Sequence, residues 1–550
     1  MASGVRRHLG ATDPRRRRDA AASVAGVADP AQAPAGRVTD AASPSTFREV
    51  ERKLRVHALF RLPDLSALSP AVAEVDEQPT RALTAVYHDT EDLRLFRWGV
   101  TLRRREGGDD EGWHLKLPVD GSSPGVRDEI RVPLAEAEVG NVPAAIAELV
   151  TAFVRRSPLV PVATLRTERT PYVLVDHDGT AVAELVDDVV SVLDGDRVAA
   201  RFREIEVESL VAGDHEVLDD MVSALVEHGA VPGSSSKAAF AVGPRANAAP
   251  DVTEPAAVTP EDPAGDAVRA HLQTHVRQLL LQDVRVRRDL PDAVHQMRVA
   301  ARRIRSGLKA FRPLLDEEWA RALRDELGWL AGELGAVRDL EVLLARLDEH
   351  AAELDRVDAD AARSAIDPAL RERARVARAH ALGALRSPRH VALLDRLVAA
   401  ANTPPMSGEA TQPCTEALPP LLDKAWRRLR KQVHDVDLDG PSAPWHQARI
   451  AAKGARYTAE ALVPVFGKPA KRFAAAVEQV TEELGEHQDA AVAAEVLRDI
   501  AQSPDVDGRA GFALGLLHAE QEQRELLARM RFLKIWPDVR RVHRRTHLSR

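Results

Sequence analysis

FREVERKLRV, residues 47–56, is the stretch that decides the fold of the first half of the chain. Side chains of a β-strand alternate between two faces, so residues two apart share a face. As a strand, this stretch has one fully charged face and one mostly apolar face. The apolar face predicts packing against a core, whereas the charged face needs another explanation. The charged face holds Glu49, Glu51, Lys53 and Arg55, and the other face holds Val50, Leu54 and Val56 together with Arg48 and Arg52.

Four further stretches repeat this arrangement. Each is short and rich in β-branched residues, and turn signals such as Gly107–Gly108 separate them. One charged strand face is usually a solvated surface, but a dry core cannot hold so many charges at a cost of several kcal/mol each. Together the stretches predict a sheet whose charged face lines a water-filled cavity. The charged positions are Arg103 and Arg105 in TLRRRE, His114 and Lys116 in WHLKLP, Arg127, Glu129 and Arg131 in VRDEIRV, and Glu204, Glu206 and Glu208 in EIEVE, opposite apolar residues such as Leu102, Leu115, Leu117, Ile205 and Val207.

Carboxylates and basic side chains in one cavity suit a particular chemistry. Clustered carboxylates bind hard divalent cations such as Mg²⁺ or Mn²⁺. Several Lys and Arg side chains beside them suit a chain of phosphates. Both kinds of cation neutralise charge on phosphoryl groups, which the hydrolysis of a triphosphate requires. The sequence therefore predicts a metal-dependent site for a triphosphate-containing substrate.

The chain of 550 residues divides into an α+β half and a helical half. In the first half, helical stretches near 143–154 and 214–228 interrupt the strand-like ones, which indicates an antiparallel α+β domain. Five prolines and many alanines then form a linker, after which the pattern keeps a helical period. The predicted segments are a disordered tail at 1–46, an α+β domain at 47–243, a linker at 244–263 and an all-α domain at 264–545.

The composition excludes some classes of protein. Cys414 is the only cysteine, so no intrachain disulfide can form, which fits a reducing compartment. No apolar stretch reaches about 18 residues, and no apolar segment follows the basic run Arg15–Arg18. We therefore expect a cytoplasmic protein without a membrane partner. The formal net charge of -8 does not exclude an anion-binding site, because basic residues can be clustered locally.

The charged stretches occur in the order expected of a known family. Glu49-x-Glu51-x-Lys53 resembles the ExExK signature of the CYTH superfamily, the triphosphate tunnel metalloenzymes. The resemblance covers nearly all of 47–243. ExExK alone is weak evidence, whereas the ordered set is strong. The set continues with YHDTEDLRLFRWGVTLRRRE (87–106), WHLKLP, VRDEIRV, LRTERTPY, EIEVE and SSSKAAF.

This resemblance implies a fold, an activity and a set of site residues. The fold is an eight-stranded antiparallel β tunnel with helices outside, and the activity is hydrolysis of triphosphate-containing substrates with Mg²⁺ or Mn²⁺. Arg166 and Arg169 are three residues apart, so a straight strand cannot point both inward, and we assign Arg166. Asp188 is preferred to Asp187, because it shares a face with Glu184. The implied catalytic residues are Glu49, Glu51 and Lys53; the metal ligands are Glu49, Glu51, Glu204, Glu206 and Glu208; the phosphate-binding residues are Lys53, Arg103, Arg105, Lys116, Arg127, Arg166 and Lys237.

Two basic stripes are the main feature of the helical half. Helical side chains three or four residues apart share a face, and HQMRVAARRIRSG (from 295) and HQARIAAKGARYT (from 446) place basic residues at that spacing. A basic helix face is ordinarily just solvated. However, no acid interrupts these stripes at i+4, and the stripe occurs twice. The stripes are His295, Arg298, Arg302, Arg305 and Lys309, and His446, Arg449, Lys453 and Arg456.

The stripes belong to an internal repeat. LGAVRDLEVL (from 334) is matched by LGEHQDAAVA (from 484), so two motifs recur in order at offsets of 151 and 150 residues. The repeat predicts two pseudo-symmetric helical bundles, about 264–402 and 421–545, separated by a Pro-rich break. Their stripes could form one surface for a long linear polyanion. A zinc site is the weaker alternative, because no carboxylate or Cys pair lies at ligand spacing with the histidines.

These motifs resemble the CHAD domain, over about 264–545. HxxRVxxRRxR at 295–305, its partner at 446–456, and the LGxxRD and LGxxQD motifs carry the resemblance. It implies an all-helical domain that binds inorganic polyphosphate and is found fused to CYTH domains. In the second copy Lys453 replaces an Arg. DKAWRRLRKQ (423–432) and RRVHRRTH (540–547) add basic side chains that either extend this surface or are simply solvated.

The two resemblances predict an enzyme that hydrolyses tripolyphosphate or short polyphosphate and carries a polyphosphate-binding domain. CYTH proteins also make cyclic AMP from ATP or hydrolyse thiamine triphosphate, but aromatic residues are only 4% of this chain, and no strand offers a platform for a base. Those two activities stay open as alternatives, as does a non-catalytic protein that binds polyphosphate or targets polyphosphate granules. A nucleic-acid partner is disfavoured, because aromatic residues are scarce near the stripes. The expected location is the cytoplasm, including polyphosphate granules.

Overall fold

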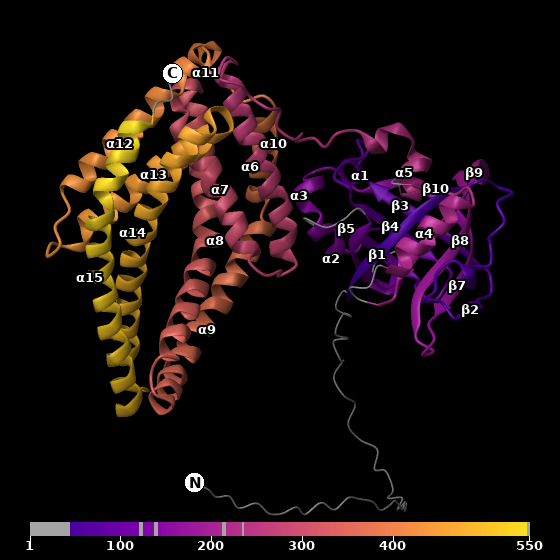
Figure 1. Cartoon of the computed structure of the whole chain (residues 1–550), viewed down its shortest axis with the longest axis horizontal. Coiled ribbons are helices and arrows are strands. Elements are labelled where there is room, and N and C mark those ends of the chain that lie inside the picture. Colours follow the sequence, from indigo (N-terminus) through magenta and orange to yellow (C-terminus); the bar gives the residue numbers. More distant parts are fainter. Residues whose placement is uncertain (1–44, 120–124, 137–140, 212–215, 234–235, 547–550) are drawn as a thin grey trace, which may run out of the picture. The chain divides into compact units, whose positions relative to one another are not determined.

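The structure, a computed structural model, describes residues 45–119, 125–136, 141–211, 216–233 and 236–546 (Figure 1). A strand-rich half is followed by a helical half, as the sequence predicts. The strands are β1 (Ser45–Val56), β2 (Glu74–Glu77), β3 (Arg81–Asp89), β4 (Thr101–Glu106), β5 (Gly112–Pro118), β6 (Val126–Val132), β7 (Val160–Val175), β8 (Ala181–Asp194), β9 (Arg197–Ser209) and β10 (Val231–Gly233). The helices are α1 (Arg94–Arg97), α2 (Ala144–Leu149), α3 (Thr151–Val154), α4 (Glu216–Glu227), α5 (Lys237–Val242), α6 (Ala264–Arg287), α7 (Ala293–Ala310), α8 (Glu317–Ala351), α9 (Arg356–Arg386), α10 (Pro388–Asn402), α11 (Cys414–Ala417), α12 (Pro419–His434), α13 (Ser442–Phe466), α14 (Lys468–Ala501) and α15 (Gly508–Arg545).

Eight of the strands close into an antiparallel barrel. Their order is β1-β6-β5-β4-β3-β7-β8-β9, and β9 pairs back onto β1. At this closing seam Glu51 lies opposite Glu208, and Lys53 lies opposite Glu206. The two short strands β2 and β10 add to β7 and β1 without belonging to the ring. The predicted eight-stranded antiparallel tunnel is therefore confirmed.

The outer face of the barrel is apolar and covered. Leu54, Ile205 and Val207 are fully buried in one cluster with Met221 and Leu225 of α4. On another side, Leu102, Leu115 and Leu117 are buried in a cluster that includes Phe153 of α3. Burial of these side chains removes apolar surface from water and leaves the charged faces to point inward. The alternation in the sequence therefore predicts correctly which face is which.

One strand is much longer than its sequence predicts. β7 runs from Val160 to Val175 and thus extends beyond LRTERTPY (165–172) at both ends. Pro161 and Pro171 weaken the local strand signal, since proline removes a ladder hydrogen bond. In the barrel, β7 pairs with β3 from Val160 to Arg169 and with β8 from Thr164 to Val175. This pairing overrides the local signal.

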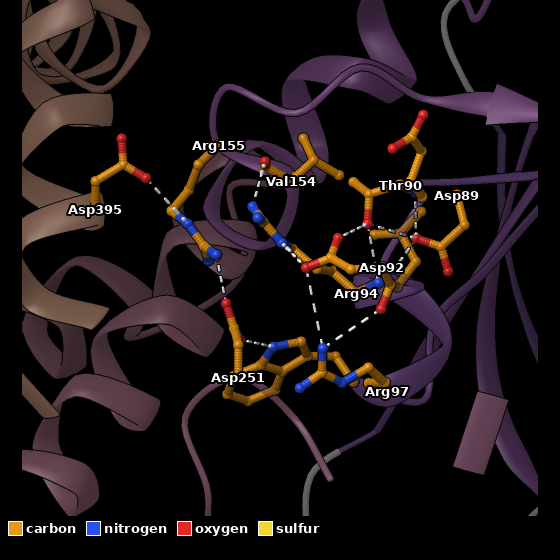
Figure 2. A network of polar contacts seen from close by, with 12 residues as sticks. Asp89, Thr90, Asp92, Arg94, Arg97, Val154, Arg155, Asp251 and Asp395 are labelled. Atoms are coloured by element: carbon orange, nitrogen blue, oxygen red, sulfur yellow. Dashed lines mark hydrogen bonds and ion pairs between the residues drawn. The ribbon is translucent and has the colours of Figure 1, made fainter. Parts of the chain in front are cut away.

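The segment predicted to be a linker, 244–263, is held by side-chain contacts. Val252 is fully buried. Asp251 accepts hydrogen bonds from Trp98 Nε1 at 2.9 Å and from Arg155 (Figure 2). Arg155 Nε lies 3.2 Å from Asp395 of α10. The segment is therefore packed rather than free.

The barrel domain begins at an earlier residue than the sequence predicts. β1 already includes Ser45 and Thr46, because they pair with β6. The rest of the predicted disordered tail, 1–44, lies outside the described residues. The α+β domain therefore starts at Ser45 in the structure.

The helical half contains the same four helices twice. α6, α7, α8 and α9 are followed, after the Pro-rich break, by α12, α13, α14 and α15. The two sequence motifs contact each other in both copies: Arg298 Nη1 lies 2.7 Å from Asp339, and Arg449 Nη2 lies 3.8 Å from Asp489. Equivalent residues therefore make equivalent contacts, which supports the predicted duplication. No helix in the described part of the chain is long and apolar enough to span a membrane.

Candidate active site and polyanion-binding surface

The interior of the barrel is a charged cavity of about 280 Å³. The strands place their charged faces into it, and one tyrosine is the only aromatic residue among the described residues of its wall. The charged face of residues 47–56 is thus part of a cavity wall. Of the residues assigned from the sequence, Glu49, Glu51, Lys53, Arg103, Arg105, Lys116, Glu206, Glu208 and Lys237 line this cavity.

Lys237 is a cation of the cavity that is surrounded by carboxylates. It is the first residue of α5, whose N-terminus is capped by Ser236. Its Nζ lies 2.9 Å from Asp188, 2.7 Å from Glu204 and 2.7 Å from Glu206. Burial disfavours the charged form of Lys237, but Asp188, Glu206 and Glu204 outweigh burial and raise its pKa. Asp188 is fully buried and contacts Lys237 and Arg169, which line the cavity, so it points inward as predicted.

The carboxylates of β1 are only partly neutralised. Lys53 Nζ lies 2.9 Å from Glu51, and Lys116 Nζ lies 2.6 Å from Glu49. The other oxygen of Glu49, Oε2, is buried without a hydrogen-bond partner among the described residues. Burial and then the charge of Glu49 raise the pKa of Glu208 to about 8. This part of the cavity therefore has more carboxylates than cations to balance them.

The residues present fit a divalent cation at this place. Mg²⁺ and Mn²⁺ prefer oxygen ligands, and the unpaired oxygen of Glu49 and the carboxylate of Glu208 offer them. Within the described ranges, no three acidic, His or Cys side chains already converge at ligand distance. Binding would therefore require Lys53 and Lys116 to release their carboxylates, for which the phosphates of a substrate are suitable alternative partners.

The basic part of the cavity is organised around Glu129. His114 Nδ1 lies 3.0 Å from this carboxylate, Arg131 Nε 2.6 Å, Arg103 Nη2 3.7 Å and Lys116 Nζ 3.8 Å. Burial opposes the ionisation of Glu129, but its hydrogen bond to His114 and the charges of Lys116 and Arg103 hold its pKa well below the ordinary value. One buried carboxylate thus positions several cations, which leaves a net positive wall.

The structure corrects the assignment of Arg166. This residue is exposed on β7, whereas Arg169 lines the cavity. Arg169 Nη2 lies 2.7 Å from Asp188 and 3.1 Å from Glu206. Side chains alternate along a strand, so Thr167 and Arg169 share the inner face and Arg166 lies on the other. The choice between the two arginines was therefore wrong.

Two other assigned residues lie away from the cavity wall. Glu204 is only 1% exposed and is covered by Lys237. Arg127 lies opposite Glu49 near the start of β6, and it does not line the cavity. The alternation of side chains predicts the face on which a side chain lies but not its position along the barrel axis. Glu129 and Arg131, predicted to lie on the charged face but given no role, also line the cavity, as do Arg81, Tyr87 and Arg169, with Asp109 and Asp110 from the β4–β5 loop.

The two basic stripes of the helical half lie close together, one on α7 and the other on α13. Burial, followed by the charges of Arg449, Arg302 and Arg298, lowers the pKa of Lys453 to about 8. The cations of the first repeat thus lie beside those of the second. The Nε atoms of Arg302 and Arg449 are buried and have no hydrogen-bond partner in the described part of the chain. The assigned residues are His295, Arg298, Arg302 and Arg305 on α7, and His446, Arg449, Lys453 and Arg456 on α13.

The basic surface continues toward α12. Burial and then the nearby charge of Arg428 lower the pKa of Lys309, and Arg324 and Arg305 add to this effect. The Nε of Arg324 is also buried and unpartnered among the residues described. Of the two possibilities for the basic run at 423–432, the structure therefore supports an extension of the surface, at least at Arg428.

Acidic residues do interrupt the stripes, contrary to the expectation from the sequence. Arg456 Nε lies 2.7 Å from Glu460, four residues later, and Arg456 also contacts Glu478. His446 Nδ1 lies 2.7 Å from Gln488 Oε1, so its ring is oriented by an amide. No set of three His, Cys, Asp or Glu side chains in the described part of the chain is arranged to hold a metal ion. The surface is thus a mixture of neutralised and free cations.

Comparison with known proteins agrees with this arrangement. Residues 48–238 match the model of the CYTH domain, and residues 270–498 match the model of the CHAD domain. The chain is 35% identical over 522 residues to Uncharacterized protein MT2285 of Mycobacterium tuberculosis (strain CDC 1551 / Oshkosh), covering 90% of this chain and 96% of that protein. The match to Uncharacterized protein Rv2226 of strain H37Rv has the same identity and coverage.

Two solved structures resemble part of the chain. PptA from Streptomyces chartreusis is 28% identical, with a TM-score of 0.44, and the match covers 50% of this chain and 100% of that one. The CHAD domain from the plant Ricinus communis is 29% identical, with a TM-score of 0.42, and the match covers 51% of this chain and 95% of that one. Members of the CYTH family are triphosphate-processing metalloenzymes. The chain belongs to the family of proteins that join a CYTH domain to a CHAD domain.

Proposed function

We propose that the barrel hydrolyses inorganic tripolyphosphate, or the end of a short polyphosphate, with Mg²⁺ or Mn²⁺, and that the helical domain binds polyphosphate. The observation that carries this proposal is the barrel cavity, whose cations surround a space beside incompletely neutralised carboxylates. When bound, the divalent cation supplies Lewis-acid polarisation of the phosphoryl oxygens. The chain itself binds and orients the phosphate chain.

The side chains of the cavity suit an in-line displacement. Water attacks the terminal phosphorus, the bond to the bridging oxygen breaks, and phosphate and diphosphate are released. Lys53 and Lys116 would exchange their carboxylate partners for phosphate oxygens, while Arg103 offers a planar fork of donors. Catalysis of this kind depends mainly on positioning and charge neutralisation, which the rigid barrel wall favours.

The wall favours an inorganic substrate over a nucleotide. Tyr87 is the only aromatic residue among the described residues that line the cavity, and its hydroxyl bonds to Arg103. A base or a thiazole ring would need an apolar or aromatic surface, which is not offered there. The same absence argues against cyclisation of ATP and against thiamine triphosphate.

The first experiment is an assay of phosphate release by the full chain. We expect release from tripolyphosphate that requires Mg²⁺ or Mn²⁺ and stops when a chelator removes the metal. ATP, with cyclic AMP as the measured product, and thiamine triphosphate serve as competing substrates. No release from any of the three, with polyphosphate still bound, would leave a binding protein; cyclic AMP as the main product would instead establish a cyclase.

The polyphosphate-binding proposal for the helical domain rests on the excess positive charge between α7 and α13. Burial, together with repulsion from neighbouring arginines, lowers the pKa values of Arg302 and Lys453, and a bound anion would relieve the repulsion. A linear phosphate polymer can contact both stripes at once. Binding would also bring the protein to polyphosphate granules in the cytoplasm.

Lys453 should make polyphosphate binding depend on pH. Its pKa is about 8 in the free protein, and bound phosphate raises it. As pH rises through about 8 the free protein loses this charge, so affinity should fall by up to about tenfold per pH unit. Arg302 is the equivalent of Lys453 in the first repeat. Lys453→Arg therefore introduces the residue type of the first repeat, and the arginine side chain stays charged. Fluorescence anisotropy with labelled polyphosphate should therefore show a flatter pH profile for Lys453→Arg, and equal profiles would contradict this role.

A further inference from the structure

Helix α15 has two apolar sides, one buried and one exposed. On the inner side, Leu514 and Leu517 are buried in one cluster with Leu497 of α14. The opposite side repeats apolar residues at helical spacing, yet it is exposed. Single exposed apolar residues are ordinary, whereas a stripe of them along one helix face marks an interaction site. The exposed apolar residues include Phe512 at 60%, and Leu516, Leu526, Met530 and Leu533 at between 39% and 44%.

We name the exposed side the α15 stripe, and its residues follow a heptad spacing. Steps of four and three residues alternate along it over three heptads, a length of about 33 Å. This spacing is typical of a helix that packs against another helix in a coiled coil. One polar residue, Gln523, interrupts the stripe, and a single polar residue at such a position fixes the register of the pair. The stripe consists of Phe512, Leu516, Ala519, Gln523, Leu526, Met530 and Leu533.

The α15 stripe is complementary to itself when two copies run antiparallel. A two-fold axis midway between residues 524 and 525 pairs Gln523 of one copy with Leu526 of the second. The same axis pairs Ala519 with Met530, so that a small side chain faces a long one. The two Gln523 amides then lie in neighbouring layers, where they are able to hydrogen-bond to each other. The partner that fits the stripe is therefore a second copy of this chain.

Charge at the two ends of α15 favours the antiparallel orientation. The C-terminal end, residues 534–545, carries five Lys and Arg side chains and one carboxylate. At the N-terminal end, the segments 353–360 and 499–509 carry seven carboxylates and two arginines. These two segments meet, since Arg509 Nε lies 3.9 Å from Asp358. An antiparallel pair places each basic end beside an acidic end, whereas a parallel pair would bring like charges together.

We propose that the α15 stripe is the interface of a homodimer in which two α15 helices pack antiparallel. Burial of the exposed side chains removes apolar surface from water, which stabilises the association. None of the stripe residues lines the barrel cavity, and none belongs to the basic stripes of α7 and α13. The dimer therefore depends neither on the proposed hydrolysis nor on polyphosphate binding.

Light scattering after size-exclusion chromatography tests the dimer. We expect twice the mass of one chain for the unaltered protein. Leu526→Glu/Met530→Glu should have the mass of one chain, because each change would bury a carboxylate in the interface. Val189→Glu/Val376→Glu is the matched control and should remain a dimer, since both valines are similarly exposed but lie on β8 and α9. The mass of one chain for the unaltered protein, or a dimeric Leu526→Glu/Met530→Glu, would overturn the proposal.

Disulfide cross-linking tests the orientation and leaves the apolar stripe largely intact. Cys414 is buried, so engineered cysteines on the surface are the reactive ones. In the antiparallel pair residue 519 of one copy faces residue 530 of the other. The two residues 519 lie about 16 Å apart along the axis, beyond the roughly 7 Å between Cα atoms that a disulfide spans. Ala519→Cys/Met530→Cys should therefore form a covalent dimer, and Ala519→Cys alone should not. The opposite result for either variant contradicts the antiparallel pair.

Discussion

Replacing Glu49 and Glu51 together with glutamine should lower metal-dependent phosphate release by at least about a thousandfold. Glutamine keeps the size of the side chain but removes the charge that would hold the cation. In the structure Glu49 lies 2.6 Å from Lys116, and Glu51 lies 2.9 Å from Lys53. The substitution therefore removes the proposed metal ligands and also frees two lysines from their partners. Single-turnover assays with tripolyphosphate at saturating Mg²⁺ and Mn²⁺ measure the loss.

The matched control for this double substitution is Glu74→Gln/Glu77→Gln. These two residues lie on β2 of the same domain, and both are exposed and absent from the cavity wall. The control makes the same chemical change and should retain activity within about twofold. Polyphosphate binding by the helical domain should be equal in both variants, which verifies folding. Full activity in Glu49→Gln/Glu51→Gln would show that the cavity is not the active site.

The inner wall of the barrel was largely predictable because strand alternation is a local property. Glu49, Glu51 and Lys53 sit in one stretch, and their shared face follows from the period of two alone. The choice between Arg166 and Arg169 failed for the opposite reason. Their orientation depends on the register of β7, and its first half shows no clear strand signal. Register is set by pairing with β8 and with β3, and β3 is distant in sequence.

The position of the β4–β5 loop, residues 107–111, could not be predicted from the sequence at all. GGDDE (107–111) predicts a turn with acidic residues, which is ordinarily a solvated loop. The contacts of Asp109 with Arg81 and of Asp110 with Arg105 arise only because β3 and β4 are neighbours in the closed barrel. Asp109 and Asp110, which the sequence places in an ordinary solvated turn, therefore line the cavity.

For the helical surface, too, the sequence predicts the features that depend on local periodicity and not those that depend on contacts between distant residues. Helical periodicity predicts each stripe, and the repeat offset predicts that there are two. No local pattern shows that Arg302 of α7 lies near Lys453 of α13, because this depends on how the repeats pack. The partners of Arg298 and Arg449 were equally hidden, although the motifs that supply Asp339 and Asp489 had been recognised.

Replacing Arg302 and Arg449 together with alanine should weaken polyphosphate binding by about a hundredfold at low salt. Both side chains have a buried Nε without a hydrogen-bond partner among the described residues, so neither is fully engaged by the protein itself. Each removed phosphate contact should also lower the dependence of log affinity on log salt concentration by about one unit. Anisotropy titrations with labelled polyphosphate over a salt series give both values.

Arg371→Ala/Arg375→Ala provides the matched control for the helical surface. These arginines lie on α9, are 71% exposed, and pair with Asp367 and Glu372. The control changes the net charge by the same amount, so any difference reports position rather than overall charge. It should bind polyphosphate nearly as well as the unaltered chain and keep the salt dependence. An equal loss in both variants would mean that binding follows net charge alone, and a surface built between α7 and α13 would then be the wrong explanation. Phosphate release from tripolyphosphate should stay unchanged in both, because the barrel cavity contains none of these residues.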